Sequence, residues 1–249
     1  MQFMLLHTLD ENLKLDGSQA LALESTLVEW IEEVHRLEVN VQGSRLRPTS
    51  DATTVRIRAG ELVVTDGPFA ESKEQIVGYD VLDCRDIDEA LGWAAKHPSA
   101  RMGSIEVRPL IEDSPPTVLP EQRAQTIRYL LIVCVDESVQ LSPDEAQEMG
   151  PATDAWVHAG EQKSTRLFGS RLDSVGTAKT LRISNDQVLI SDGPFADTKE
   201  QVAGFDVLEC ADLDEALAIA ALHPVARIGA LEVRPFWPFD GTSPMVRIV

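Results

Sequence analysis

The sequence predicts an α+β protein made of two copies of one small domain, which pack on each other as a covalent pseudo-dimer. The first observation is an internal repeat. Residues 66–110 match residues 192–236 at a constant shift of 126 positions, without a gap and with more than half of the positions identical. The second is a strand-type alternation of apolar and polar residues, and the third is a helical stripe of apolar residues. The repeat therefore has the pattern of a folded α+β unit.

The front halves of the two copies have diverged more but keep the same register. Trp30 falls on Trp156, Gly43 on Gly169 and Arg56 on Arg182. A gapless register of this length indicates a duplication. Pro115, Pro116 and Pro120 between the copies predict a stiff linker. The predicted organisation is repeat 1 over residues 1–112, a Pro-rich linker over 113–126, repeat 2 over 127–237 and a C-terminal tail over 238–249.

Each copy is predicted to run strand, helix, two or three strands, helix, strand. In the first copy we expect strands over residues 3–9, 53–58, 61–65, 78–84 and 104–109. Leu23, Leu27, Ile31 and Val34 form one stripe of the first helix. The second helix begins after Asp86 and ends before Pro98. In the second copy, Gly150-Pro151 predicts a kink or an end in the first helix.

This element order implies helices on one face of an antiparallel sheet, the ferredoxin-like βαββαβ layout. One layer of helices covers only one face of such a sheet. We therefore expect the two repeats to depend on each other, each covering the other's open face.

Composition excludes several classes of function. The formal net charge is −19, which disfavours binding to nucleic acid. The apolar run at residues 1–6 is too short for a signal peptide or a membrane span, so we expect a cytoplasmic protein that does not bind membranes. Cys84, Cys134 and Cys210 form no CxxC and are interpreted as buried apolar residues rather than metal ligands. No P-loop, dinucleotide fingerprint or HExxH motif is present, so no metal or cofactor is predicted.

The string Asp66-Gly67-Pro68-Phe69-Ala70, repeated at residues 192–196, together with Glu-Val-Arg-Pro at 106–109, resembles the DGPF-domain branch of the YCII-related family. The resemblance covers nearly the whole chain, once per copy. It implies a dimeric α+β barrel, with both units here supplied by one chain. It also implies a link to signalling by extracytoplasmic-function sigma factors. The YCII branch carries a proposed His/Asp catalytic pair, but its histidine position falls near Thr26 and Ala152, which cannot act as acid or base.

Strand alternation places charged residues between the two sheets. If Ile105 and Val107 face the helices, Glu106 and Arg108 face the opposite repeat. Two interpretations stay open: buried Arg–Glu pairs that dock the halves, or a pocket for a small anionic or polar molecule. The Asp-Gly-Pro-Phe turn is either a structural turn or the rim of that pocket. The candidate ligand-binding residues are Arg56, Asp66, Lys73, Glu106 and Arg108, with Arg182, Asp192, Lys199, Glu232 and Arg234 in repeat 2.

His97 and His223 end their helices just before a proline. They are either partners of the helix dipole or general bases without a visible partner. The sequence therefore assigns no catalytic residue. It favours a small-molecule-binding or regulatory module, with a cofactor-free enzyme whose site lies between the sheets as the alternative. The assembly is expected to be a pseudo-dimeric monomer or a homodimer.

Overall fold

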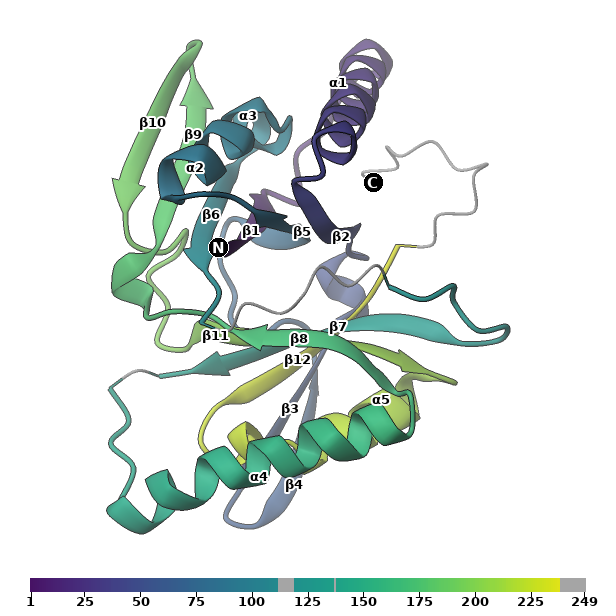
Figure 1. The fold of residues 1–249 in the computed structure, drawn as a ribbon, viewed down its shortest axis with the longest axis vertical. Helices are drawn as coiled ribbons and strands as arrows, with labels where there is room; N and C mark the ends of the chain where they lie inside the picture. Colours follow the sequence, from purple (N-terminus) through teal and green to yellow (C-terminus); the bar gives the residue numbers. More distant parts are fainter. Residues whose placement is uncertain (112–118, 137, 238–249) are drawn as a thin grey trace.

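The computed structural model describes residues 1–111, 119–136 and 138–237, except for the side chain of Asn40. Two six-stranded antiparallel sheets stack face to face, and the helices cover their outer faces (Figure 1). The predicted pair of ferredoxin-like repeats packed sheet to sheet is therefore confirmed. Residues 113–118 of the predicted linker, and the predicted tail over 238–249, lie outside the described residues.

The elements follow the predicted order in both repeats except for one strand: four strands, rather than two or three, lie between the two main helices, because β2 in repeat 1 and β8 in repeat 2 were not predicted. Repeat 1 consists of β1 (Gln2–Leu9), α1 (Gly17–Arg36), β2 (Asn40–Arg45), β3 (Thr53–Arg58), β4 (Glu61–Asp66), β5 (Gln75–Asp83), α2 (Ile87–Lys96), α3 (Ser99–Met102) and β6 (Ser104–Pro109). Repeat 2 consists of β7 (Ile127–Val135), α4 (Pro143–Gln162), β8 (Arg166–Arg171), β9 (Lys179–Ser184), β10 (Gln187–Asp192), β11 (Gln201–Cys210), α5 (Leu213–Leu222) and β12 (Ala230–Pro235). Of the helices in the described part of the chain, none is both long and apolar enough to cross a membrane.

The two repeats exchange a hairpin. One sheet has the order β10-β9-β6-β1-β5-β2, and the other has the order β4-β3-β12-β7-β11-β8. The hairpin β3–β4 of repeat 1 therefore extends the sheet of repeat 2, and β9–β10 extends the sheet of repeat 1 (Figure 1). Sequence patterns predicted the hairpins but not the exchange, because alternation does not say which edge a strand joins.

Helix α2 begins where the sequence predicts, but α4 does not end where a break was considered. The Asp86 side chain accepts a hydrogen bond from the backbone N–H of Glu89, as expected for the start of α2. Of the predicted kink or end at Gly150-Pro151, the end is wrong, because α4 continues through both residues. A capping box at Ser142 fixes one end of α4, and the Trp156 indole N–H donates to the Ile219 carbonyl at 3.0 Å. These contacts outweigh the one backbone hydrogen bond lost at Pro151.

Three apolar clusters form the core. One lies between the sheets and includes Met4, Leu6, Tyr79, Ile132 and Phe205. The other two lie beneath the helices of each repeat, around Trp30 and Trp156. Ile105 and Val107 belong to a helix-side cluster, so β6 has the predicted orientation. The space between the sheets is therefore filled largely by apolar side chains.

Two buried ion pairs join the repeats at the centre. Arg108 pairs with Glu106 on its own strand, and both side chains are 1% exposed. The second oxygen of Glu106 accepts the backbone N–H of Phe195 at 3.0 Å. Arg108 also donates to the carbonyl of Val202 at 2.5 Å. The Asp-Gly-Pro-Phe turn of repeat 2 is thus hydrogen-bonded to a carboxylate of repeat 1.

The same arrangement occurs in the opposite direction. Arg234 pairs with Glu232, and Glu232 accepts the backbone N–H of Phe69 at 2.9 Å. Arg234 also donates to the Ile76 carbonyl at 3.0 Å. A buried carboxylate and a buried guanidinium are stable only when they are paired and hydrogen-bonded. Each repeat supplies part of the partners that the other repeat requires.

Expressing residues 1–112 alone tests this dependence. The fragment lacks β12, one of the two strands with which β3 pairs, and exposes the apolar face of its sheet, so we expect a homodimer with exchanged hairpins or an aggregate. Light scattering after size exclusion measures the outcome. A well-folded monomer of this fragment would contradict the interdependence of the repeats.

Replacing Arg108 with alanine tests the buried pair. The substitution leaves Glu106 buried with its ionic partner removed, and we expect the free energy of unfolding to fall by about 3–5 kcal/mol. The control is Arg101→Ala, because the pair of Arg101 with Asp186 is exposed at 61% and 87% and should be worth less than about 1 kcal/mol. Urea unfolding measures both. Equal effects of the two substitutions would contradict the structural role of Arg108.

Candidate functional site

A histidine and an aspartate meet on the helix side of the repeat 1 sheet. His7 follows Phe3 and Leu5 on the face of β1 that carries the helix-side core. Asp80 of β5 lies opposite Leu5 and two residues from Gly78, which lies opposite His7, so the two side chains are diagonal neighbours on one face. His7 Nε2 lies 2.8 Å from Asp80 Oδ2, and the side chains are 4% and 14% exposed. This is a nearly buried, charge-assisted hydrogen bond.

A glycine makes room for the carboxylate. Gly43 of β2 lies directly opposite Asp80 in the ladder. A Cβ atom at Gly43 would lie 1.9 Å from Asp80 Oδ1, so the carboxylate occupies the space that any other residue would fill. Gly169 has the same relation to Asp206 in repeat 2, at 2.1 Å. The cradle for the carboxylate is therefore shared by both repeats.

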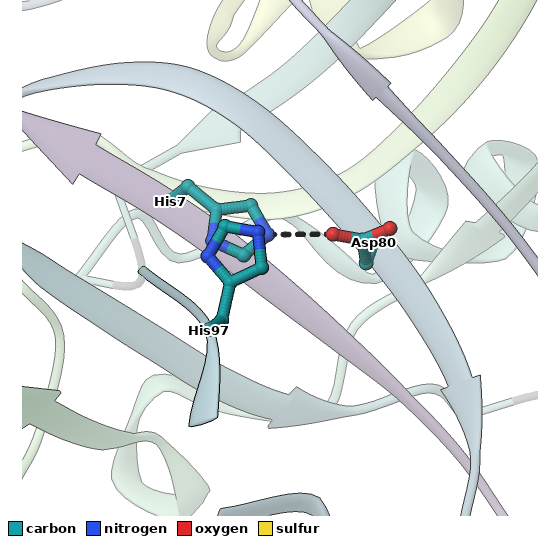
Figure 2. Close-up of side chains that lie close together, drawn as sticks. All are labelled: His7, Asp80 and His97. Carbon is teal, nitrogen blue, oxygen red and sulfur yellow. Dashed lines mark hydrogen bonds and ion pairs between the residues drawn. The ribbon is translucent and has the colours of Figure 1, made fainter. Parts of the chain in front are cut away.

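The third polar group is His97, at the C-terminal end of α2. Its ring stacks on His7 with centroids 4.0 Å apart and meets Trp30 edge-on at 4.7 Å. Figure 2 shows the two imidazoles overlapping, with Asp80 at the edge of His7. Burial, together with the repulsion that a protonated His7 would add, holds the pKa of His97 well below its usual value, so this imidazole is neutral.

A hydrogen bond sets the tautomer of His97. Its Nδ1 accepts the backbone N–H of Ser99 at 3.2 Å, which leaves the ring proton on Nε2. His223 accepts the backbone N–H of Val225 in the same way in repeat 2. The predicted alternatives for these histidines were a dipole partner or a general base. The structure shows a shared role in capping the turn after the helix.

His7, Asp80 and His97 also form a candidate metal cluster, with ligand atoms within 4.8 Å of one another. A metal bound at Nε2 of His97 would require the ring proton to leave that nitrogen. The hydrogen bond from Ser99 to Nδ1 opposes this, because Nδ1 then cannot hold the proton. The residues therefore fit a proton-transfer site better than a metal centre.

The pair lies in a pocket of about 600 Å³ between α1 and the sheet of repeat 1. The predicted stripe of α1 is only partly buried: Val34 is in the core, whereas Leu23, Leu27 and Ile31 line the pocket. Figure 1 shows α1 leaning away from the sheet. The pocket thus offers a largely apolar wall opposite a polar floor.

The mouth of the pocket includes a residue from the end of repeat 2. The guanidinium of Arg45 lies 4.3 Å from the ring centroid of Trp237. The backbone N–H of Trp237 donates to the Arg45 carbonyl at 2.8 Å, which fixes the chain beside β2. The equivalent of Trp237 beside repeat 2 is Ile111, whose N–H donates to Arg171. The two repeats therefore present different side chains at equivalent backbone positions.

Repeat 2 lacks the histidine of the pair. Val133 occupies the position equivalent to His7. Asp206, the equivalent of Asp80, instead forms an ion pair with Arg166 at 2.7 Å. Burial raises the pKa of Asp206 to about 6, although Arg166 acts in the opposite direction. Burial, together with the charge of Arg166, lowers the pKa of His223 to about 4. The acid–base arrangement of repeat 1 is thus replaced in repeat 2 by a salt bridge.

The residues that the sequence singled out lie elsewhere, mostly at the junction of the repeats. Besides the central pairs of Glu106 with Arg108 and of Glu232 with Arg234, Arg56 lies 2.7 Å from Glu200 and Arg182 lies 3.1 Å from Glu74.

The charged residues of the two turns lie further out. Asp66 and Lys73 are exposed, Asp192 pairs with Lys179 at 2.5 Å, and Lys199 lies 3.8 Å from Asp136. Ligand binding by any of these ten residues stays a prediction.

Sequence reasoning missed His7 and Asp80, although a signal was present. Alternation on β1 places His7 on the same face as Phe3 and Leu5, and alternation on β5 places Asp80 with Leu82. A polar residue on a face that packs beneath a helix requires an explanation. The two signals meet only once the pairing of β1 with β5 is known.

Comparisons with known proteins identify the domain and its repetition. The model of the YCII-related domain matches residues 1–114 and 128–240. An uncharacterized protein of Rhizobium meliloti strain 1021 is 52% identical over 69 residues, which is 27% of this chain. The matched segment spans 56% of that relative, so the chain covers little more than half of its length.

Several solved structures are similar to the chain over most of its length, at low identity. A structure described as a chlorite dismutase has a TM-score of 0.48 and 8% identity, covering 95% of this chain and 94% of its own. A mutant chlorite dismutase from Candidatus Nitrospira defluvii has a TM-score of 0.45 and 8% identity, covering 96% and 92%. A structure described as a monooxygenase, from Fusobacterium nucleatum, has a TM-score of 0.40 and 10% identity, covering 94% and 91%. At this level of similarity, the likeness says nothing about what the chain binds.

Substituting Gly43 with alanine tests how the pair is held. The added Cβ displaces the Asp80 carboxylate, so we expect the hydrogen-bonded Nε2 proton of His7 to be lost from the NMR spectrum of histidine-labelled protein. Overpacking should also lower the free energy of unfolding by roughly 1–3 kcal/mol. Gly169→Ala is the matched control, since it creates the same crowding at Asp206 and should leave the His7 signal in place. Persistence of that signal in Gly43→Ala would contradict the assigned geometry.

Proposed function

The chain belongs to the YCII-related family, and we propose that its first repeat binds a small organic molecule and exchanges a proton with it. The observation that carries the proposal is the His7–Asp80 pair in a largely apolar pocket, present in repeat 1 and replaced in repeat 2. A pocket with a few convergent polar groups is the usual form of a small-molecule site. The sequence favoured a small-molecule-binding or regulatory module, and we add to this the transfer of a proton.

Asp80 determines which nitrogen of His7 is basic. An ionised carboxylate accepts a proton, so Nε2–H of His7 donates to Asp80 and the lone pair of the neutral ring lies on Nδ1. In the described part of the chain, Nδ1 of His7 is buried without a hydrogen-bond partner. An unsatisfied buried polar atom costs roughly 1–3 kcal/mol, which a ligand that donates a proton to Nδ1 would recover. Because this atom is covered, we infer that ligand entry shifts the side chains around it.

The chemistry this supports needs no cofactor. His7 removes a proton from an acidic C–H or O–H of the ligand, and Asp80 stabilises the imidazolium that forms. Return of the same proton to another atom of the ligand completes an isomerisation, with atoms and charge balanced. His97 keeps its proton on Nε2, and its neutral ring stacks on the ring of His7.

The apolar stripe of α1 indicates what the ligand looks like. Leu23, Leu27 and Ile31 would contact an apolar body, while His7 meets the acidic group. We propose a compact molecule with a carbonyl or enol beside a hydrocarbon or aromatic part. The binding of an anion between the sheets, and a link to sigma-factor signalling, stay predictions. A ligand-responsive pocket would serve such a signalling role.

Two measurements test the proposal. The first is a thermal-shift screen of small carbonyl compounds and aromatic acids on the wild type and on His7→Val, which installs the residue of repeat 2. We expect stabilising compounds to lose their effect in His7→Val. The control Asp206→Asn, at the equivalent of Asp80, should retain it, as should Arg56→Ala. Loss of the effect in Arg56→Ala, with retention in His7→Val, would place the site between the sheets instead.

The second measurement separates catalysis from binding. A stabilising compound is incubated with the protein in D₂O, and exchange of its acidic C–H is followed by NMR. A positioned base accelerates proton transfer by roughly 10²–10⁴-fold, so His7→Val should reduce the exchange rate by a similar factor. Binding without any exchange would contradict the acid–base role and leave a binding module.

A further inference from the structure

The strand β4 is an open sheet edge with apolar residues at its centre. It pairs with β3 on one side only and ends the sheet of repeat 2. All six of its residues are exposed. Leu62, Val63 and Val64 are 57%, 39% and 44% exposed, so both faces of this strand present apolar side chains. Such an edge is a template for pairing with another strand.

The protections against strand pairing on β4 are limited to a charged residue at each end, Glu61 and Asp66. The strand contains no proline and no lysine, and its ladder with β3 runs from Thr53–Asp66 to Arg58–Glu61 without a bulge. Soluble proteins normally protect an edge with features of this kind. The apolar centre of β4, Leu62–Val64, carries none of them and is therefore expected to be covered by a partner.

The fold itself indicates what kind of partner. The two repeats already associate by sheet extension, because β3 pairs with β12 through Val55 opposite Leu231. The strand β4 continues this interface outward by one strand. A second copy of the chain can continue it once more by the same hydrogen bonding.

A closed two-fold pair places strict demands on the register. In antiparallel pairing about a two-fold axis, one residue lies opposite the same residue of the second copy. The equivalent faces of the two sheets then lie on the same side of the joined sheet. With Val63 at the axis, Leu62 lies opposite Val64 of the second copy and Glu61 lies opposite Thr65 of the second copy. Asp66 lies opposite Gly60 of the second copy, so no like charges meet.

The equivalent edge β10 fits less well. Its residues are exposed too, and Leu189 is the equivalent of Val63. With Leu189 at the axis, Asp186 lies opposite Asp192 of the second copy, and like charges directly opposite each other are destabilising. We propose that the protein forms a two-fold homodimer by antiparallel pairing of β4 with β4 of a second copy, joining two sheets into one.

Substitution at the axis tests the dimer in the full chain. We expect the wild type to sediment at twice its chain mass of 27.3 kDa. The measurement is made at about 0.15 M salt, where the Debye length is about 8 Å. Val63→Lys should sediment as a monomer, because it places two ammonium groups opposite each other. The matched control Leu189→Lys should remain dimeric. A monomeric wild type, a dimeric Val63→Lys or a monomeric Leu189→Lys would each overturn the assignment.

Cross-linking tests the register independently of stability. Residues opposite each other in an antiparallel pair have Cα atoms about 4.5–5.5 Å apart, within the range of a disulfide. Oxidation of Val63→Cys should yield a covalent dimer on a non-reducing gel. Thr65→Cys, which lies opposite Glu61 of the second copy, and Leu189→Cys should not. The native cysteines contribute no background, because Cys84, Cys134 and Cys210 are buried. Equal cross-linking of Thr65→Cys and Val63→Cys would overturn the proposed register.

Discussion

The structure depends on two buried carboxylates, Glu106 and Glu232, at the junction of the sheets. Each binds an arginine of its own strand and the backbone N–H of a phenylalanine in the other repeat. A carboxylate at 1% exposure is stable only if its partners are present. Those partners include a turn of the other repeat, and the hairpin before that turn extends the sheet that contains the carboxylate. The exchanged hairpin therefore brings with it the turn whose backbone N–H binds the buried carboxylate.

In this arrangement the space between the sheets is filled, and the pocket lies on the helix-covered face of the repeat 1 sheet. Apolar side chains and the ion pairs occupy the space between the sheets, whereas α1 buries only Trp30 and Val34 and leaves room beneath its other apolar residues. The features shared by both repeats are those that build the scaffold, such as Gly43 with Gly169 and His97 with His223. The features that differ are those that would meet a ligand. Repeat 1 contains the His7–Asp80 pair, whereas Asp206 of repeat 2 forms a salt bridge with Arg166.

The fold was predictable because its evidence is local and occurs twice. Alternation on β6 placed Ile105 and Val107 toward the helices, and the capping residue Asp86 marked the start of α2. The stripe of α1 was correctly located, but its burial was not, since periodicity shows which side chains share a face and not how closely that face approaches the sheet. For α4, the end expected at Gly150-Pro151 does not occur, because the helix continues between the capping box at Ser142 and the contact of Trp156 with Ile219.

The sequence by itself determined the duplication, the order of elements, the family resemblance and the charged face of β6. These follow from residue spacing along the chain. Only the tertiary structure decided that the hairpins exchange sheets, that Glu106 bonds Phe195, and that His7 meets Asp80. The physical reason is that each of these depends on strand register and edge choice, which join residues far apart in the sequence. His7 and Asp80 are 73 positions apart and make contact only because β1 pairs with β5.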